Sequence, residues 1–212
     1  MNADGGPQID HLVYAVPDVD AASDDLAQRI GVRPAPGGHH PGLGSRNAVL
    51  ALGGGAYLEV IGPDPEQPAP EGPRPFGIDQ LERPRLAGWA VRAEDIDAAV
   101  RSARAAGYDP GPVVEVTRET RDGTTLRFRI TPPDAELAGV VPFLIDWGSS
   151  AHPFASAPAG ATIAGPPTIT HPDPDRVLAA LGALGVDALV LAGSHPALAI
   201  TVAGPRRAHL LR

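Results

Sequence analysis

The 212-residue sequence contains no cysteine and no lysine, since all 17 of its basic residues are arginine. The lack of cysteine excludes disulfides, thiol nucleophiles, thiolate zinc sites and cysteine-ligated iron–sulfur clusters. The lack of lysine excludes Schiff-base chemistry and a lysine-anchored pyridoxal phosphate. Nucleophilic chemistry is therefore restricted to Ser, Thr, Tyr, His, Asp and Glu side chains or to a metal-bound water.

An excess of positive charge and long apolar runs are also missing. The formal net charge is −8 at pH 7, and no cluster of arginines indicates a nucleic-acid-binding surface. No apolar run approaches the roughly 20 residues that cross a bilayer, and the opening MNADGGPQ lacks the basic and apolar parts of a signal peptide. We therefore expect a cytoplasmic protein that binds neither nucleic acid nor a membrane.

One pattern occurs three times along the chain. The copies align on Asp18, Asp95 and Asp173, at spacings of 77 and 78 residues. In each copy apolar residues then recur at helical spacing and a glycine follows, which is typical of a short amphipathic helix with an N-cap aspartate. A strand candidate precedes each helix, and runs rich in Val, Leu, Ile and Thr follow it. Each unit therefore predicts the order β-α-β-β-β or a slightly shorter version of it.

The units divide the chain into segments. We expect an α+β fold with a first βαβββ module at residues 1–64, a second at 86–150 and a shorter βαββ-type unit at 164–212. The proline-rich stretch 65–85 and the segment 151–163 are expected to be linkers.

The repeated unit resembles a known fold. Together with IDHLVYAV, GGHHPGLGSRNAVLALGGGAYLEVIGPDP and PFLIDWGSSAHP, it is similar to the vicinal oxygen chelate superfamily, and in particular to its glyoxalase-like domain branch. That superfamily includes glyoxalases, extradiol dioxygenases and bleomycin-resistance proteins. The resemblance covers residues 9 to about 155. It implies that the two modules pair, so that their curved mixed sheets form a cleft with the helices outside.

The resemblance also implies where metal ligands lie, because they project from the first and last strand of each module. It nominates His11, Glu59 and Asp146 as ligands of a divalent metal such as Mn, Fe, Ni or Zn, in a three-ligand site with open positions. The fourth position falls on Gly88, which has no side-chain ligand. With one ligand missing, a metal-free binding site is an equal alternative. No nucleotide, pyridoxal phosphate or iron–sulfur cofactor is expected.

Each of these residues also has a purely structural interpretation. Residues alternate faces along a strand, so Tyr57, Glu59 and Ile61 share one side of AYLEVIG. A buried Glu59 carboxylate would need a metal, an arginine or a hydrogen-bond donor beside it. An exposed edge-strand carboxylate is the alternative for Glu59, a hydrogen-bonded core histidine for His11, and a cap at the strand end for Asp146.

The segment GGHHPGLGSRN is the second candidate constellation, and it is expected to be a loop at the open end of the sheet. His40, Arg46 and Asn47 supply hydrogen-bond donors there, and with Glu59 they form the candidate catalytic set. In the alternative, Arg46 pairs with a carboxylate such as Glu59 and Asn47 closes the turn. His152 either replaces the missing ligand or lies on the surface.

The leading hypothesis is a glyoxalase-like enzyme that acts on a small oxygenated organic substrate. It predicts metal-assisted lyase or isomerase chemistry through an enolate-like intermediate, with Glu59 moving the proton. A metal-free protein that sequesters a small molecule such as an antibiotic is the first alternative, and an aromatic cleft near Trp89 and Trp147 would favour it. An extradiol dioxygenase is the second, and it requires His40 or His152 beside the site.

Two further points stay open in the sequence. The cleft forms either within one chain or across a homodimer. On the strand TTLRFRIT, Arg127 and Arg129 share one face, where solvent exposure is the default and an anion clamp in the cleft is the alternative.

Overall fold

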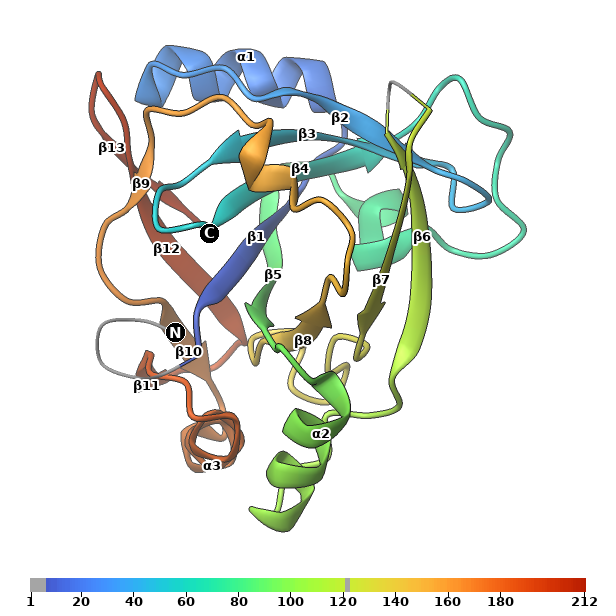
Figure 1. The fold of residues 1–212 in the computed structure, drawn as a ribbon. Coiled ribbons are helices and arrows are strands. Elements are labelled where there is room, and N and C mark those ends of the chain that lie inside the picture. The colour runs from blue at the N-terminus through green and yellow to red at the C-terminus, as the bar shows by residue number, and fades with distance from the viewer. Residues whose placement is uncertain (1–6, 121–122) are drawn as a thin grey trace.

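The computed structural model describes residues 7–120 and 123–212, in which eight strands form a closed barrel (Figure 1). The first half contributes β1 (Ile9–Ala15), β2 (Ala35–His40), β3 (Ser45–Ala51) and β4 (Tyr57–Pro63). The second half contributes β5 (Arg85–Arg92), β6 (Val114–Thr120), β7 (Thr125–Ile130) and β8 (Phe143–Asp146). The strand order around the barrel is β1-β4-β3-β2-β6-β7-β8-β5. The expected α+β class and curved mixed sheet are confirmed.

Two antiparallel seams join the halves of the barrel. At one seam β1 pairs with β5, and Val13 lies opposite Gly88. At the other, β2 pairs with β6 over Gly38 and His39. A Cβ on Gly38 would collide with the Glu119 carbonyl, so the close approach of β2 to β6 depends on a glycine. The expectation that GGHHPGLGSRN is a loop is wrong: residues up to His40 belong to β2, and the turn is confined to 41–44.

The helices of the described chain lie outside the barrel. They are α1 (Val19–Ile30), α2 (Ile96–Ala105) and α3 (Pro174–Leu184). Two short 3-10 segments, η1 (Pro75–Gln80) and η2 (Pro153–Ala155), complete the helical elements, and Phe76 of η1 faces the barrel interior. The three repeated aspartates cap them as expected, since each side chain of Asp18, Asp95 and Asp173 accepts a first-turn backbone N–H. Within the described residues, none of these helices is long and apolar enough to cross a membrane.

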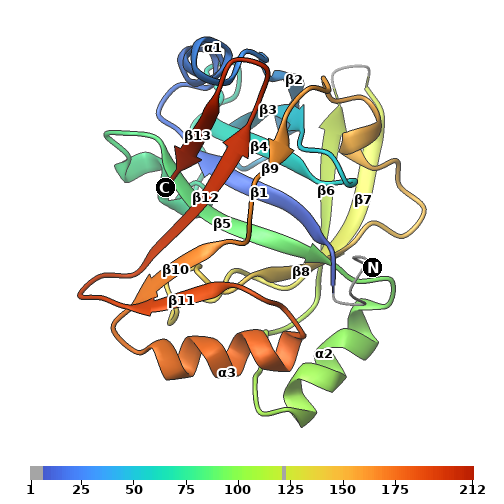
Figure 2. The same cartoon turned by 90° about the vertical axis from the view of Figure 1, so that its left-hand side faces the viewer.

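A smaller sheet covers one side of the barrel (Figure 2). It consists of β10 (Thr168–His171), β11 (Leu189–Ala192), β12 (Ala197–Ala203) and β13 (Ala208–Leu211) in the order β11-β10-β12-β13, and β9 (Thr162–Ile163) pairs with β12. β12 packs against β5, β13 packs against α1, and α3 lies beside α2.

Strand alternation divides the apolar residues into two cores. On β1, Leu12 and Tyr14 join the outer core beneath the helices and the small sheet. Val13 and Ala15, which alternate with them, join an inner core inside the barrel. Alternate positions of the same strands therefore point into the barrel, where His11 also lies.

Candidate active site

The barrel encloses a cavity of about 300 Å³, at the lower end of the range for small-molecule sites. Its wall is mostly apolar and partly aromatic, with the rings of Tyr57, Phe76, Phe128, Phe143 and Trp147. The polar side chains in the wall are His11, His40, Glu59 and Arg118.

Glu59 points into this cavity from the middle of β4. Tyr57 and Ile61 face the same way, as strand alternation predicted, and Glu59 is only 8% exposed. Asn47 on β3 donates its side-chain N–H to Glu59 Oε1. The amide oxygen of Asn47 in turn accepts the backbone N–H of Gly38 at 2.9 Å. Asn47 therefore connects the carboxylate to the backbone of β2 and fixes its orientation.

Glu59 is ionised at neutral pH. Burial raises the pKa of its carboxyl. Electrostatic interactions with His11, His40 and Arg118 and the hydrogen bond from Asn47 lower the pKa by more, so the net pKa shift is downward. His40 Nε2 lies 3.8 Å from Glu59 Oε1. Burial lowers the pKa of His40 by more than the charge of Glu59 raises it, so its imidazole is neutral at pH 7.

His11 on β1 is oriented by the residue before it. Its Nδ1 contacts Asp10 Oδ1 at 2.8 Å, and its ring stacks on Tyr57 with centroids 4.9 Å apart. Asp10 is fully buried. Burial raises the pKa of Asp10, but hydrogen bonds from His11 and His152 outweigh burial and hold the pKa far below its usual range. Because an ionised carboxylate only accepts hydrogen bonds, Nδ1 of His11 donates to Asp10, and this contact fixes the orientation of the ring.

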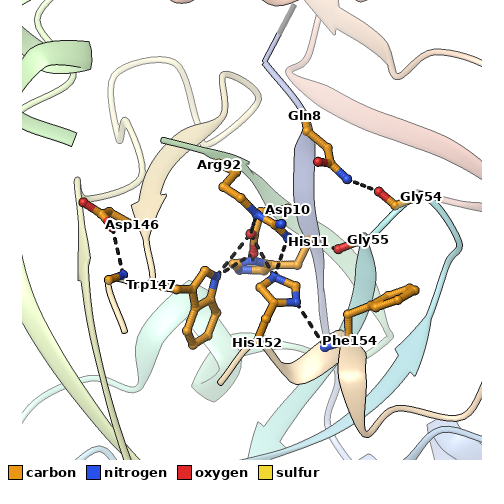
Figure 3. A network of polar contacts seen from close by, with 11 residues as sticks. Gln8, Asp10, His11, Gly54, Gly55, Arg92, Asp146, Trp147, His152 and Phe154 are labelled. Carbon is orange, nitrogen blue, oxygen red and sulfur yellow. Dashed lines mark hydrogen bonds and ion pairs between the residues drawn. The ribbon is translucent and has the colours of Figure 1, made fainter. Parts of the chain in front are cut away.

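Asp10 is the centre of a polar network next to the cavity (Figure 3). Besides His11, three side chains donate to its carboxylate: Arg92 Nε at 2.9 Å, His152 Nε2 at 3.0 Å and Trp147 Nε1 at 3.1 Å. The network joins β1, β5, the end of β8 and the start of η2. His152 is thus a partner of Asp10. Sequence reasoning missed Asp10, whose signal was an aspartate directly before His11 in an otherwise apolar strand.

Arg118 on β6 brings a positive charge into the cavity, and sequence reasoning missed it as well. It is 4% exposed, and its Nε is buried without a hydrogen-bond partner in the described chain. Val116 lines the cavity on the same side of β6, whereas Glu115 and Thr117 are exposed. Alternation along VVEVTRE was the signal that could have placed Arg118 inside.

Arg46 does not contribute to the cavity. Its Nη2 donates to Asp20 Oδ2 at 2.8 Å, so it pairs with the start of α1 and not with Glu59. Of the candidate catalytic set, the structure brings His40, Asn47 and Glu59 together and leaves Arg46 apart.

The arginines of β7 lie on the outer face of the barrel. The Arg127 side chain is 73% exposed, and Arg129 forms an ion pair with Asp97 at 2.8 Å. Phe128, between them, lines the cavity. The alternative of an anion clamp formed by these two arginines is therefore wrong, because strand alternation turns them to solvent.

Asp146 does not reach the cavity either. Ile145 and Trp147, on either side of it, line the cavity, so the Asp146 side chain points the other way (Figure 3). Its carboxylate accepts the backbone N–H of Gly148 at 2.9 Å. The expected alternative, a cap at the strand end, describes this geometry, and Asp146 does not share a site with His11 and Glu59.

The donor set therefore does not fit the metal site that the resemblance implied. His40 joins His11 and Glu59 in the cavity, yet the ligand atoms of these three do not all lie within 4.8 Å of one another. Among the residues that the structure describes, one set of three does meet this distance, and it consists of His39, Asp64 and Glu66. In that set His39 Nδ1 already contacts Asp64 Oδ2 at 2.6 Å.

The sequence profile of the glyoxalase-like domain matches residues 9–185, which span the barrel and α3. The chain belongs to the glyoxalase-like domain family. The resemblance to the vicinal oxygen chelate superfamily is thereby confirmed. No curated protein matches the chain.

One solved structure supports the fold, and two others are less similar. A hypothetical protein from Staphylococcus aureus is 14% identical, with a TM-score of 0.61 over 96% of this chain and 85% of that one. Methylmalonyl-CoA epimerase from Mycobacterium tuberculosis is 24% identical, with a TM-score of 0.49 over 70% of this chain and 93% of that one. The Streptomyces coelicolor epimerase is 20% identical, with a TM-score of 0.48 over 70% and 100%.

Proposed function

We propose that this glyoxalase-like protein is an enzyme that moves a proton at a carbon next to a carbonyl group. The substrate is a small oxygenated organic molecule, and the reaction is an isomerisation or a lyase step through an enolate-like intermediate. The observation that carries the proposal is Glu59, an ionised carboxylate held by Asn47 against a mostly apolar cavity. A fixed base in such surroundings interacts more strongly with a substrate than it would in water.

In the proposed reaction Glu59 is the base. Its carboxylate takes the proton from carbon, the C–H electron pair enters the C–C bond, and the π pair of the carbonyl moves onto oxygen. Returning the proton to the same or the neighbouring carbon completes an isomerisation. Asn47 is a positioning residue, because its hydrogen bond occupies Oε1 and leaves Oε2 for the substrate. His11 also lines the cavity, with its ring orientation fixed by the contact between Nδ1 and Asp10.

We assign no step to a divalent metal. His11, Glu59 and Asp146 do not converge, because Asp146 caps Gly148 on the outer face of the barrel. The extradiol alternative required His40 or His152 at the site, and His40 does line the cavity. The ligand atoms of His11, His40 and Glu59 are nevertheless too far apart to be a preformed iron site.

A metal-free binding protein is the second candidate, and the aromatic wall of the cavity favours it. The ring centroids of Phe128 and Trp147 lie 4.7 Å apart with the ring planes tilted by 39°, and both residues line the cavity. Trp89, which was expected to lie near an aromatic cleft, is instead buried in the outer core, and its indole N–H donates to the Val140 carbonyl. A protein that binds a small molecule but does not accelerate exchange of its carbon-bound hydrogen would match this candidate.

Exchange of carbon-bound hydrogen in D₂O tests the proposal. Phenylpyruvate and phenylacetone are incubated with chelator-treated protein, and loss of their methylene proton signals is followed by NMR above the spontaneous rate. We expect the wild type to accelerate exchange of at least one ketone and Glu59→Gln to be slower by about 10²- to 10⁴-fold, the usual contribution of a general base.

Asp146→Asn is the matched control, because it removes a carboxylate that lies outside the cavity. It should exchange at the wild-type rate. Wild-type exchange by Glu59→Gln, or equal losses in both variants, would refute the role of Glu59 as the base.

A further inference from the structure

The cavity contains a buried cation, Arg118, that forms no ion pair with the described residues. Arg118 is almost completely buried on the inner side of β6 and lines the cavity. Its Nε has no hydrogen-bond partner in the described chain. Burying an arginine without a partner is costly, because its charged N–H groups lose their hydrogen bonds to water and gain none in the protein.

The nearby acidic residues do not neutralise this charge by contact. Glu115 and Glu119 are exposed on the other side of β6. Glu59 is the carboxylate that lines the cavity, and it is hydrogen-bonded to Asn47, with no ion pair to Arg118. His40, the histidine in contact with Glu59, is neutral at pH 7 and competes for no anion. The Arg118 guanidinium is therefore available to an anionic ligand.

We propose that Arg118 is the anion-binding residue of the cavity and that the ligand is a small, mostly apolar monocarboxylate. The planar guanidinium binds the carboxylate through two parallel N–H···O bonds, a geometry that lysine does not reproduce. The apolar body of the ligand lies against the rings of Phe128, Phe143 and Trp147. The proposal names the substrate class of the proposed function and in that respect rests on it.

The charges of Glu59 and Arg118 lead to a second testable consequence for carboxylate binding. A bound carboxylate brings a second negative charge beside Glu59, and the positive charge of Arg118 offsets one of the two. Removing the charge of Glu59 should therefore leave carboxylate binding intact or strengthen it, while it slows proton exchange. Glu59→Gln therefore distinguishes the two proposals, because it should lower the exchange rate and should not weaken carboxylate binding.

The experiment is isothermal titration calorimetry with 3-phenylpropanoate and its neutral amide, 3-phenylpropanamide. We expect the wild type to bind the acid at least about tenfold more tightly than the amide, the fold-change for one hydrogen-bonded charge. Arg118→Gln should lose that preference, and Arg118→Lys should recover part of it. Arg127→Gln, which removes an exposed arginine from the neighbouring strand, should bind like the wild type.

Equal affinity of the wild type for the acid and the amide overturns the proposal, and this comparison needs no variant to fold. An undiminished preference in Arg118→Gln, or the same loss in Arg127→Gln, also overturns it. Failure of the proposed function looks different: neither phenylpyruvate nor phenylacetone would show exchange that depends on Glu59, whatever Arg118 binds.

Discussion

Replacing Asp10 by asparagine should destabilise the protein more than any conservative change at the surface. Asp10 is fully buried, and its carboxylate accepts hydrogen bonds from His11, Arg92, Trp147 and His152. Asparagine has nearly the same shape, so the substitution removes the charge without leaving a cavity. It also places an amide N–H group against donors.

The size of the effect follows from these contacts. The amide oxygen of asparagine keeps at most two of the four bonds, and each lost bond to a charged group costs about 1.5–3 kcal/mol. Arg92 and His152 are partly exposed and can turn toward water, which reduces the cost. We therefore expect a loss of about 3 kcal/mol in the free energy of unfolding, at the lower end for breaking a buried ion pair.

Urea unfolding followed by circular dichroism measures this loss, with Asp146→Asn as the control. Asp146 accepts one backbone N–H at the surface, so its amide variant should lose less than about 1 kcal/mol. Because folding lowers the pKa of Asp10, its contribution is complete above the unfolded-state pKa near 4 and declines by about 1.4 kcal/mol per pH unit below it. Equal stabilities of the two variants at pH 7, or a difference that grows below pH 4, would refute this reasoning.

Further predictions concern the base, the packing and metal removal. Asn47→Leu removes a hydrogen bond that lowers the pKa of Glu59, so the acid limb of the exchange rate should move to higher pH in a pH–rate profile. Gly62→Ala should cost about 1–3 kcal/mol in urea unfolding, because its Cβ would lie 2.8 Å from the Val16 carbonyl oxygen. Gly182→Ala, in α3 with open space around it, should instead stabilise by up to about 1 kcal/mol. Treatment with EDTA should leave the exchange rate of the accepted ketone unchanged, and a loss that added metal restores would contradict the proposed mechanism.

Local sequence signals predicted the helices and most strands of the fold. The spacing of Asp18, Asp95 and Asp173 located three helix starts, since an N-cap depends only on residues of the same turn. β2 was missed because APGGHH is rich in proline and glycine and has little strand propensity. Its strand conformation depends on pairing with β3 and β6, which are distant in sequence.

The site was predictable only where one strand determines it. Alternation placed Tyr57, Glu59 and Ile61 on one face, and all three line the cavity. At β8 the same rule turns Asp146 outward, because Ile145 and Trp147 on either side of it face the cavity.

Contacts between strands account for the rest of the site. Arg118 meets the cavity only after β6 pairs with β2 and closes the barrel. Asp10 gains the hydrogen bonds from Trp147 and His152 only in the folded chain, because both residues are distant from it in sequence.

The most direct test of the central claim is a crystal structure of Glu59→Gln with phenylpyruvate bound. The variant lacks the proposed base and should hold the substrate unreacted. We predict the ligand inside the barrel, with its carboxylate on the Arg118 guanidinium and its methylene carbon facing the side chain at position 59. A ligand bound outside the barrel, or a metal ion on His11 with the ligand coordinated to it, would contradict the account.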